Sequence, residues 1–180
     1  MKFSSSRKVN NSGYTLIELI VVISIMAVLT GTLGFSASLV FSRDAEKCAT
    51  RLNDAIYTTR MNSMSKSGTY ELTVDSGTAN VATIACDGTD ETEIYLDNVE
   101  DNKKTTVDAN FITEDGSSTN LSLPVTIVFD KAKGNVKFDV NGDGTPDDGI
   151  IVFDITAVRG NRTSKVQLVT TTGKHTIGDF

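Results

Sequence analysis

The sequence predicts an α+β chain in which a long N-terminal α-helix, with a transmembrane first half and an amphipathic second half, packs on a C-terminal antiparallel β-sheet. No ionisable side chain occurs between Leu19 and Ser42. From there to Lys66, apolar residues recur every three or four positions, which is the period of an amphipathic helix. After Gly68 the chain changes to short alternating segments separated by glycine-containing turns, a pattern typical of antiparallel strands.

The first element is preceded by a polar leader, residues 1–13, which has three basic residues and no acid. The apolar run that follows has about 24 residues. As a helix it would be roughly 36 Å long at about 1.5 Å per residue, enough to cross a bilayer core of about 30 Å. Basic residues before such a run place its N-terminus in the cytoplasm. We therefore expect residues 14–42 to cross the cytoplasmic membrane once, with the rest of the chain outside.

The same helix is expected to continue beyond the apolar run, because no proline or glycine interrupts residues 35–66. Gly68 is a natural stop. The prediction is one helix over residues 14–67, whose first half serves a bilayer or filament core and whose second half packs on the sheet. The expected packed stripe comprises Phe41, Ala45, Cys48, Leu52, Ala55, Ile56 and Thr59.

Residues 43–180 are predicted to form one extracytoplasmic α+β domain, in which one face of the sheet covers that stripe. Gly134 and Gly173 stand in hairpin turns that need a positive φ. The acidic, turn-rich stretch 87–122 is predicted to be the most irregular and mobile part. Strands are expected at 70–74, 81–85, 93–96, 125–129, 136–140, 150–153, 166–170 and 174–177.

Charge and composition argue against several functions. The formal net charge is −6, and without Lys2, Arg7 and Lys8 the chain has 14 basic and 23 acidic residues, a charge of −9. An acidic domain is poorly suited to nucleic acid or anionic lipid, so no nucleic-acid partner is expected. His175 is the only histidine. It cannot build a typical zinc site, and no hydrolytic triad is indicated, so we expect no enzymatic activity and no required cofactor.

The stretch Gly13-Tyr14-Thr15-Leu16-Ile17-Glu18, followed by Leu19-Ile20-Val21-Val22-Ile23, resembles the processing signature of the type IV pilin and pseudopilin superfamily. The resemblance implies that a prepilin peptidase cuts after Gly13 and that Tyr14 becomes the methylated N-terminus. It implies an extracytoplasmic filament built from homologous pilin or pseudopilin subunits. Further implied partners are an assembly platform, an assembly ATPase and, before assembly, membrane lipid.

Glu18 is the candidate assembly residue. An unpaired carboxylate at membrane depth costs on the order of 2–3 kcal/mol or more, so it should have a partner. The resemblance implies that Glu18 pairs with the free amine of Tyr14 in a neighbouring subunit. A misaligned subunit would leave two uncompensated charges, and the pair would therefore set the axial register. The alternative is a carboxylate that lipid headgroups simply solvate.

The rest of the chain is similar to minor pseudopilins of the H type in Leu52, Arg60, the segment 127–130, Gly134 and the hairpin around Gly173. Phe35 also stands where many major pilins have a proline that kinks the helix. A minor subunit of a pilus, a type II secretion-like filament or a DNA-uptake filament is therefore expected. Two alternatives stay open: a membrane-anchored binding module, and a secreted protein whose ordinary signal peptide is cut near Ala37.

One loop has the spacing of a calcium site. Its glycine-rich sequence places oxygen ligands at positions 1, 3, 5, 7 and 9 of an EF-hand-like loop, although position 12 is Ile150 instead of an acid. Calcium is a candidate ligand, with a weak affinity of around 10⁻⁴–10⁻³ M, and an ion-free acidic hairpin is the alternative. The candidate ligands are Asp139, Asn141, Asp143, Thr145 and Asp147.

Cys48 and Cys86 would both lie outside the cytoplasm, where a disulfide is permitted. A bridge between them could tie the sheet to the helix. Two separate buried thiols are the alternative, since the sequence gives no distance between them.

Overall fold

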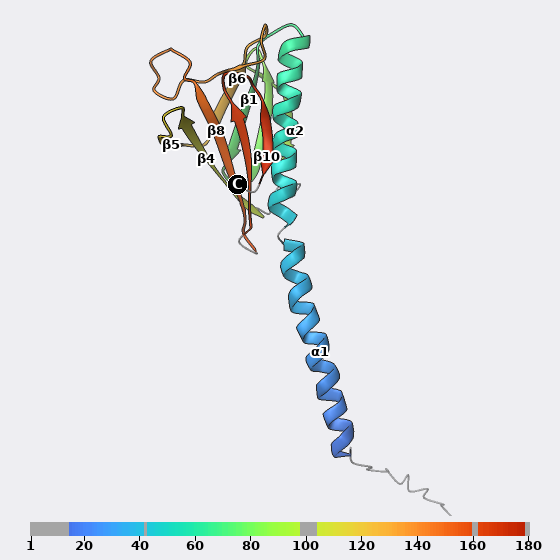
Figure 1. The fold of residues 1–180 in the computed structure, drawn as a ribbon. Helices are drawn as coiled ribbons and strands as arrows, with labels where there is room; N and C mark the ends of the chain where they lie inside the picture. The colour runs from blue at the N-terminus through green and yellow to red at the C-terminus, as the bar shows by residue number, and fades with distance from the viewer. Residues whose placement is uncertain (1–14, 42, 98–103, 160–161, 179–180) are drawn as a thin grey trace, which may run out of the picture. The chain divides into compact units, whose positions relative to one another are not determined.

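The computed structural model describes residues 15–41, 43–97, 104–159 and 162–178, and side chains of the first helix are described as far as Gly31. The chain divides into two compact units, Met1–Ala37 and Ser38–Phe180. Two helices, α1 (Leu16–Phe41) and α2 (Arg43–Ser65), precede ten strands (Figure 1). The leader and the candidate processing residues Gly13 and Tyr14 lie outside the described residues.

One expectation about the N-terminal helix is corrected. The structure gives two helices, α1 and α2, in place of one helix over residues 14–67, and the second ends at Ser65. In the described part of the chain, no helix combines the length and the apolar character needed to cross a membrane. The assignment of residues 14–42 as a membrane span stays a prediction.

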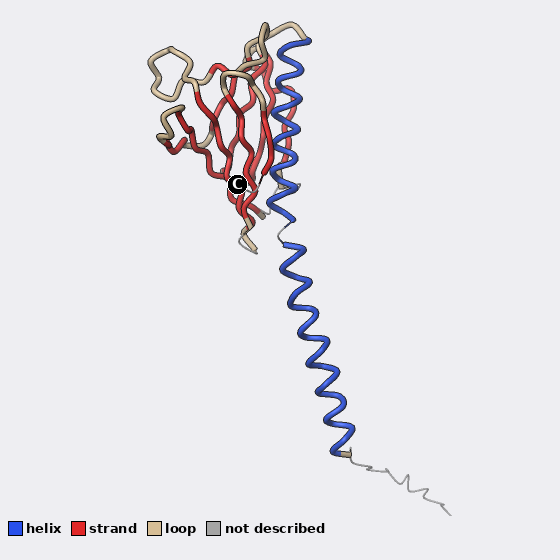
Figure 2. Tube along the Cα trace, in the orientation of Figure 1, coloured by secondary structure: helices blue, strands red, loops and turns tan. Residues whose placement is uncertain are grey.

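Helix α2 packs through the predicted stripe from Ala45 to Thr59, and the side chain of Phe41, the first residue of that stripe, lies outside the described residues. Its fully buried residues recur at three- and four-residue steps, and polar side chains occupy the opposite face. The helix runs alongside the strands (Figure 2) and contacts strands of both sheets of the domain. Its buried residues are Ala45, Cys48, Ala49, Leu52, Ala55, Ile56, Thr59 and Ser63.

The strands form two five-stranded sheets, where the sequence predicted one. Sheet A has the order β3-β2-β1-β6-β7 and sheet B the order β10-β9-β8-β4-β5, and all pairs are antiparallel. Sheet A consists of β1 (Tyr70–Ser76), β2 (Asn80–Cys86), β3 (Thr89–Tyr95), β6 (Val125–Phe129) and β7 (Val136–Lys137). Sheet B consists of β4 (Thr105–Thr113), β5 (Ser118–Leu121), β8 (Gly149–Ala157), β9 (Thr163–Val169) and β10 (His175–Gly178).

The expectation that residues 87–122 are irregular is wrong, because β3, β4 and β5 all lie there. Strand β4 pairs with β8 over nine residues and is an inner strand of sheet B. Val107, Ala109 and Phe111 point into the core, while Asp108 is exposed between them. The two-residue period was present in the sequence, but the acidic composition of the region concealed it.

Candidate functional site

The carboxylate of Glu18 caps the start of α1. The backbone N–H of Thr15 donates to Glu18 Oε2 at 3.0 Å, and the Thr15 hydroxyl donates to the same oxygen at 3.0 Å. In return, the Glu18 backbone N–H donates to Thr15 Oγ1 at 3.4 Å. This reciprocal arrangement is a capping box, with Thr15 as the N-cap and Glu18 at the third helical position. A negative charge in this turn also complements the helix dipole.

The sequence analysis did not predict this capping role of Glu18. The pattern that indicates it was present, because a threonine stands three residues before a glutamate at the start of an apolar run. Both Thr15 donors use Oε2, so Oε1 takes no part in the cap. The carboxylate can therefore cap its own helix and still accept a cation from another chain. The predicted partner of that kind, the amine of Tyr14, lies outside the described residues, so the pairing stays a prediction.

The described part of α1 is apolar on every side. Its large apolar side chains are between 47 % and 78 % exposed, and they cover all directions around the helix axis. A helix that is apolar all round is normally covered by lipid or by other protein. The site therefore combines a capped, charged end with an apolar surface that is exposed over the described part of the helix. The exposed residues include Leu16, Ile17, Leu19, Ile20, Val21, Val22, Ile23, Ile25, Met26, Val28 and Leu29.

The candidate calcium loop uses its carboxylates to hold its own backbone. Asp139 accepts N–H bonds from Gly142 at 2.6 Å and from Gly144 at 2.7 Å, and Asp143 accepts from the backbone and hydroxyl of Thr145. The side chain of Asp147 accepts the Val140 N–H at 2.8 Å. The described residues contain no group of three or more His, Cys, Asp or Glu side chains placed to hold a metal.

Calcium binding by this loop stays a prediction, and calorimetry can test it. Titration of the full-length chain with Ca²⁺ should give heat with a dissociation constant of around 10⁻⁴–10⁻³ M. Asp139→Asn should abolish that heat, because it removes the charge at position 1, whereas the matched change Asp108→Asn on sheet B should leave it unchanged. Heat that is absent from the native chain, or identical in both variants, would reject the site.

Of the two alternatives left open for Cys48 and Cys86, the structure has separate thiols, because both cysteines are free. Cys48 is fully buried near the start of α2, whereas Cys86 lies near Ser67, just beyond the other end of that helix. The 17 helical steps from Cys48 to Ser65 span roughly 25 Å at about 1.5 Å per residue. A disulfide needs Cα atoms within about 7 Å, so the bridge is excluded by distance.

The two thiols should react differently. Burial raises the pKa of Cys48 to about 12, so at pH 8 this thiol is both inaccessible and protonated. Iodoacetamide should modify the native chain once, at Cys86, and twice only after denaturation. Cys86→Ser should remove the native reaction, and Cys48→Ser should not. An intact mass two units below that of the reduced chain would contradict this prediction.

The buried carboxylate of Asp97 is a structural group. It accepts bonds from the Asn80 amide at 2.9 Å, from the Thr105 hydroxyl at 2.7 Å and from the Lys104 backbone N–H at 3.0 Å. These bonds compensate for its burial and join β2 to the start of β4. The group therefore needs no ligand to explain its position.

Comparison with known families adds one finding. Residues 8–34 match the family model described as the prokaryotic N-terminal methylation motif. No curated protein and no solved structure is similar enough to the whole chain to count as a match. The matched segment contains Thr15, Glu18 and most of the exposed apolar residues of α1.

Proposed function

We propose that this chain, which carries the prepilin signature of type IV pilins and pseudopilins, is a non-enzymatic filament subunit. A prepilin peptidase would cut it after Gly13, and Tyr14 would be methylated. The processed subunit would then leave the cytoplasmic membrane and enter an extracytoplasmic helical fibre with homologous subunits. An assembly platform and an ATPase would drive that transfer.

The observation that carries the proposal is the apolar surface of α1 behind a capped carboxylate. In the precursor, lipid would cover this surface; in the fibre, the equivalent helices of neighbouring subunits would replace the lipid. The exchange keeps the same apolar area out of water, so its hydrophobic cost is small. The Oε1 atom of Glu18, which takes no part in the bonds to Thr15, would then select the neighbouring subunit whose amine lies at the matching axial position.

A minor subunit of the pseudopilin H type is the finer proposal. Arg60 supports it, because its guanidinium donates to the carbonyls of Gly134 and Thr172, both at 3.0 Å, and so ties α2 to both hairpin turns named in the resemblance. Gly134 and Gly173 both have a positive φ of 64°. These contacts explain why those positions would recur together in a related fold.

Mass spectrometry of the chain from cells with the maturation machinery tests the proposal. The mature N-terminus should be methylated Tyr14, and Gly13→Val should leave the precursor uncut, because a branched side chain obstructs a subsite built for glycine. Ser6→Val, the same substitution within the leader, should be processed normally. An anchored but uncut native chain would favour the binding-module alternative, and a cut near Ala37 would favour a secreted protein.

A further inference from the structure

Sheet A has an uneven charge. Between Ser67 and Asp97 the chain has seven acidic residues and no lysine or arginine. Strand β3 closes one side of the sheet, and among the described strands it pairs only with β2, so its other edge has no strand beside it there. The residues from Thr89 to Glu93 are exposed. We call Asp90, Glu91 and Glu93 on this strand the acidic edge.

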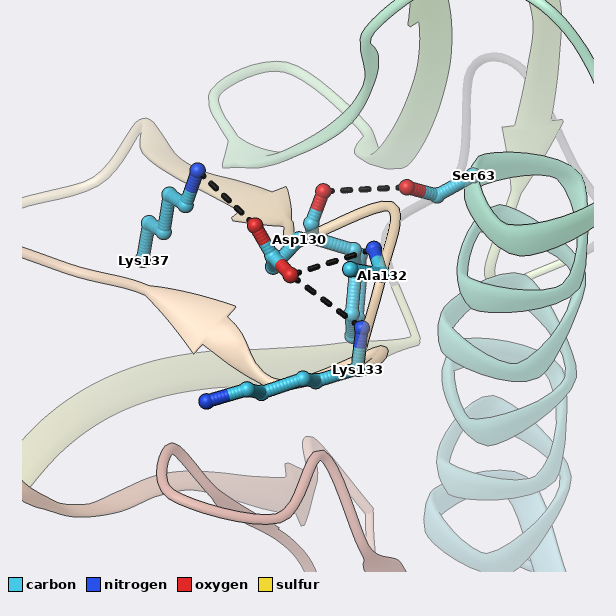
Figure 3. A network of polar contacts seen from close by, with 6 residues as sticks. Ser63, Asp130, Ala132, Lys133 and Lys137 are labelled. Carbon is cyan, nitrogen blue, oxygen red and sulfur yellow. Dashed lines mark hydrogen bonds and ion pairs between the residues drawn. The ribbon is translucent and has the colours of Figure 1, made fainter.

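On the opposite side of the same sheet, the hairpin formed by β6 and β7 is rich in lysine. Lys131, Lys133 and Lys137 belong to the β6–β7 hairpin. Asp130 holds this turn, because its Oδ2 accepts the N–H groups of Ala132 and Lys133, both at 3.1 Å, and its Oδ1 pairs with Lys137 at 3.0 Å (Figure 3). The Lys137 ammonium holds the pKa of Asp130 below its usual range.

Helix α2 fixes the position of this turn. The Ser63 hydroxyl donates to the Phe129 carbonyl at 2.9 Å, and Arg60 donates to Gly134. The turn that contains Gly173 lies against this one, because a Cβ on Gly173 would stand 1.9 Å from the Gly134 oxygen. Lys174 is the next residue and adds another lysine to the region. Lys131, Lys133 and Lys174 are exposed, and the ion pairs found in the described part of the chain do not use them. We call the two turns that carry these three lysines the lysine turns.

The two charged regions cannot neutralise each other within one molecule. Four strand spacings separate β3 from β7, which is roughly 19 Å at about 4.8 Å per strand. This distance exceeds the Debye length of about 10 Å at 0.1 M salt, so neither region cancels the electrostatic potential of the other. Complementary patches on different faces of one subunit favour a head-to-tail contact, which repeats along a filament instead of closing into a dimer.

We propose that the lysine turns of one subunit dock on the acidic edge of a second copy of this chain. The inference rests on the proposed filament function and adds to it a lateral contact between globular domains. The contact orients neighbouring domains, since rotation of one subunit would bring like charges together. The carboxylate of Glu18 would set the axial position of the subunit in the filament, and this contact would set its rotation about the filament axis.

Charge reversal in the full-length, processed chain tests the contact. Lys131→Glu/Lys133→Glu and Asp90→Lys/Glu93→Lys should each lower the amount of this chain recovered in sheared fibres about tenfold, because each creates like-charge contacts. The chain with all four changes should recover assembly, as should coexpression of the two double variants. Asp108→Lys/Glu114→Lys, a matched change at exposed acids of sheet B, should assemble normally.

Undiminished assembly of either double variant, or failure of the fourfold variant to recover, would overturn the contact. If the native chain is not processed at all, the proposed function fails first. The contact is then judged on the full-length chain in detergent, by zero-length crosslinking of a mixture of ¹⁴N- and ¹⁵N-labelled protein. Hybrid peptides that join residues 131–137 to residues 89–95 support it, and hybrid peptides that join other regions exclusively contradict it.

Discussion

Glu18→Gln should keep α1 capped and still prevent assembly. The glutamine amide oxygen can accept the two Thr15 bonds, because glutamine replaces glutamate in capping boxes. It cannot neutralise an ammonium group. Incorporation of such a subunit would bury the amine of Tyr14 without a counter-charge, at a cost of about 3–5 kcal/mol. We expect incorporation to fall by at least about a hundredfold, since each 1.4 kcal/mol is a factor of about ten.

Two comparisons separate the cap from the charge. Glu18→Ala removes both, and it should also fail to assemble. In detergent, the amide proton of Thr15 should keep its hydrogen-bonded chemical shift in Glu18→Gln and lose it in Glu18→Ala. Both variants should be processed and retained in the membrane fraction. If Glu18→Gln entered fibres as efficiently as the native chain, the function of Glu18 would be the cap, and the pairing role would be rejected.

Local patterns in this sequence predicted local structure well. The four-residue spacing of Cys48, Leu52 and Ile56 predicted the buried face of α2, and the run from Val125 to Phe129 predicted β6 with its bounds. These features depend on neighbours within a few residues, and burial enforces them. The capping box is also a local pattern, but Glu18 was interpreted only through its role in the family, so the cap was not predicted.

Features that depend on distant parts of the chain could not be predicted in this way. Strands with the same alternation fit one sheet or two, because the alternation does not say which strands pair with one another. The two cysteines occupy positions that looked compatible with a bridge until the length of α2 set them apart. The charge asymmetry of sheet A likewise appears only once strand order places β3 and β7 on opposite sides.

Gly173→Ala should destabilise the domain by about 3–5 kcal/mol. The residue has a φ of 64°, which costs an alanine roughly 1–2 kcal/mol, and its new methyl group would stand 1.9 Å from the carbonyl oxygen of Gly134. That oxygen belongs to the backbone and is held by Arg60, so it cannot rotate away as a flexible side chain could. The two turns must separate, and a charge-assisted hydrogen bond worth about 1.5–3 kcal/mol is lost.

Gly116→Ala is the matched control for this prediction. Gly116 also has a positive φ, 85°, but a Cβ there would meet nothing within 4 Å. Its substitution should therefore cost only the backbone strain of roughly 1–2 kcal/mol. Urea unfolding of the full-length chain in mild detergent, followed by tyrosine fluorescence, measures both losses. Equal losses would mean that the turns move apart without cost, and that Arg60 does not hold the two sheets together at this end of α2.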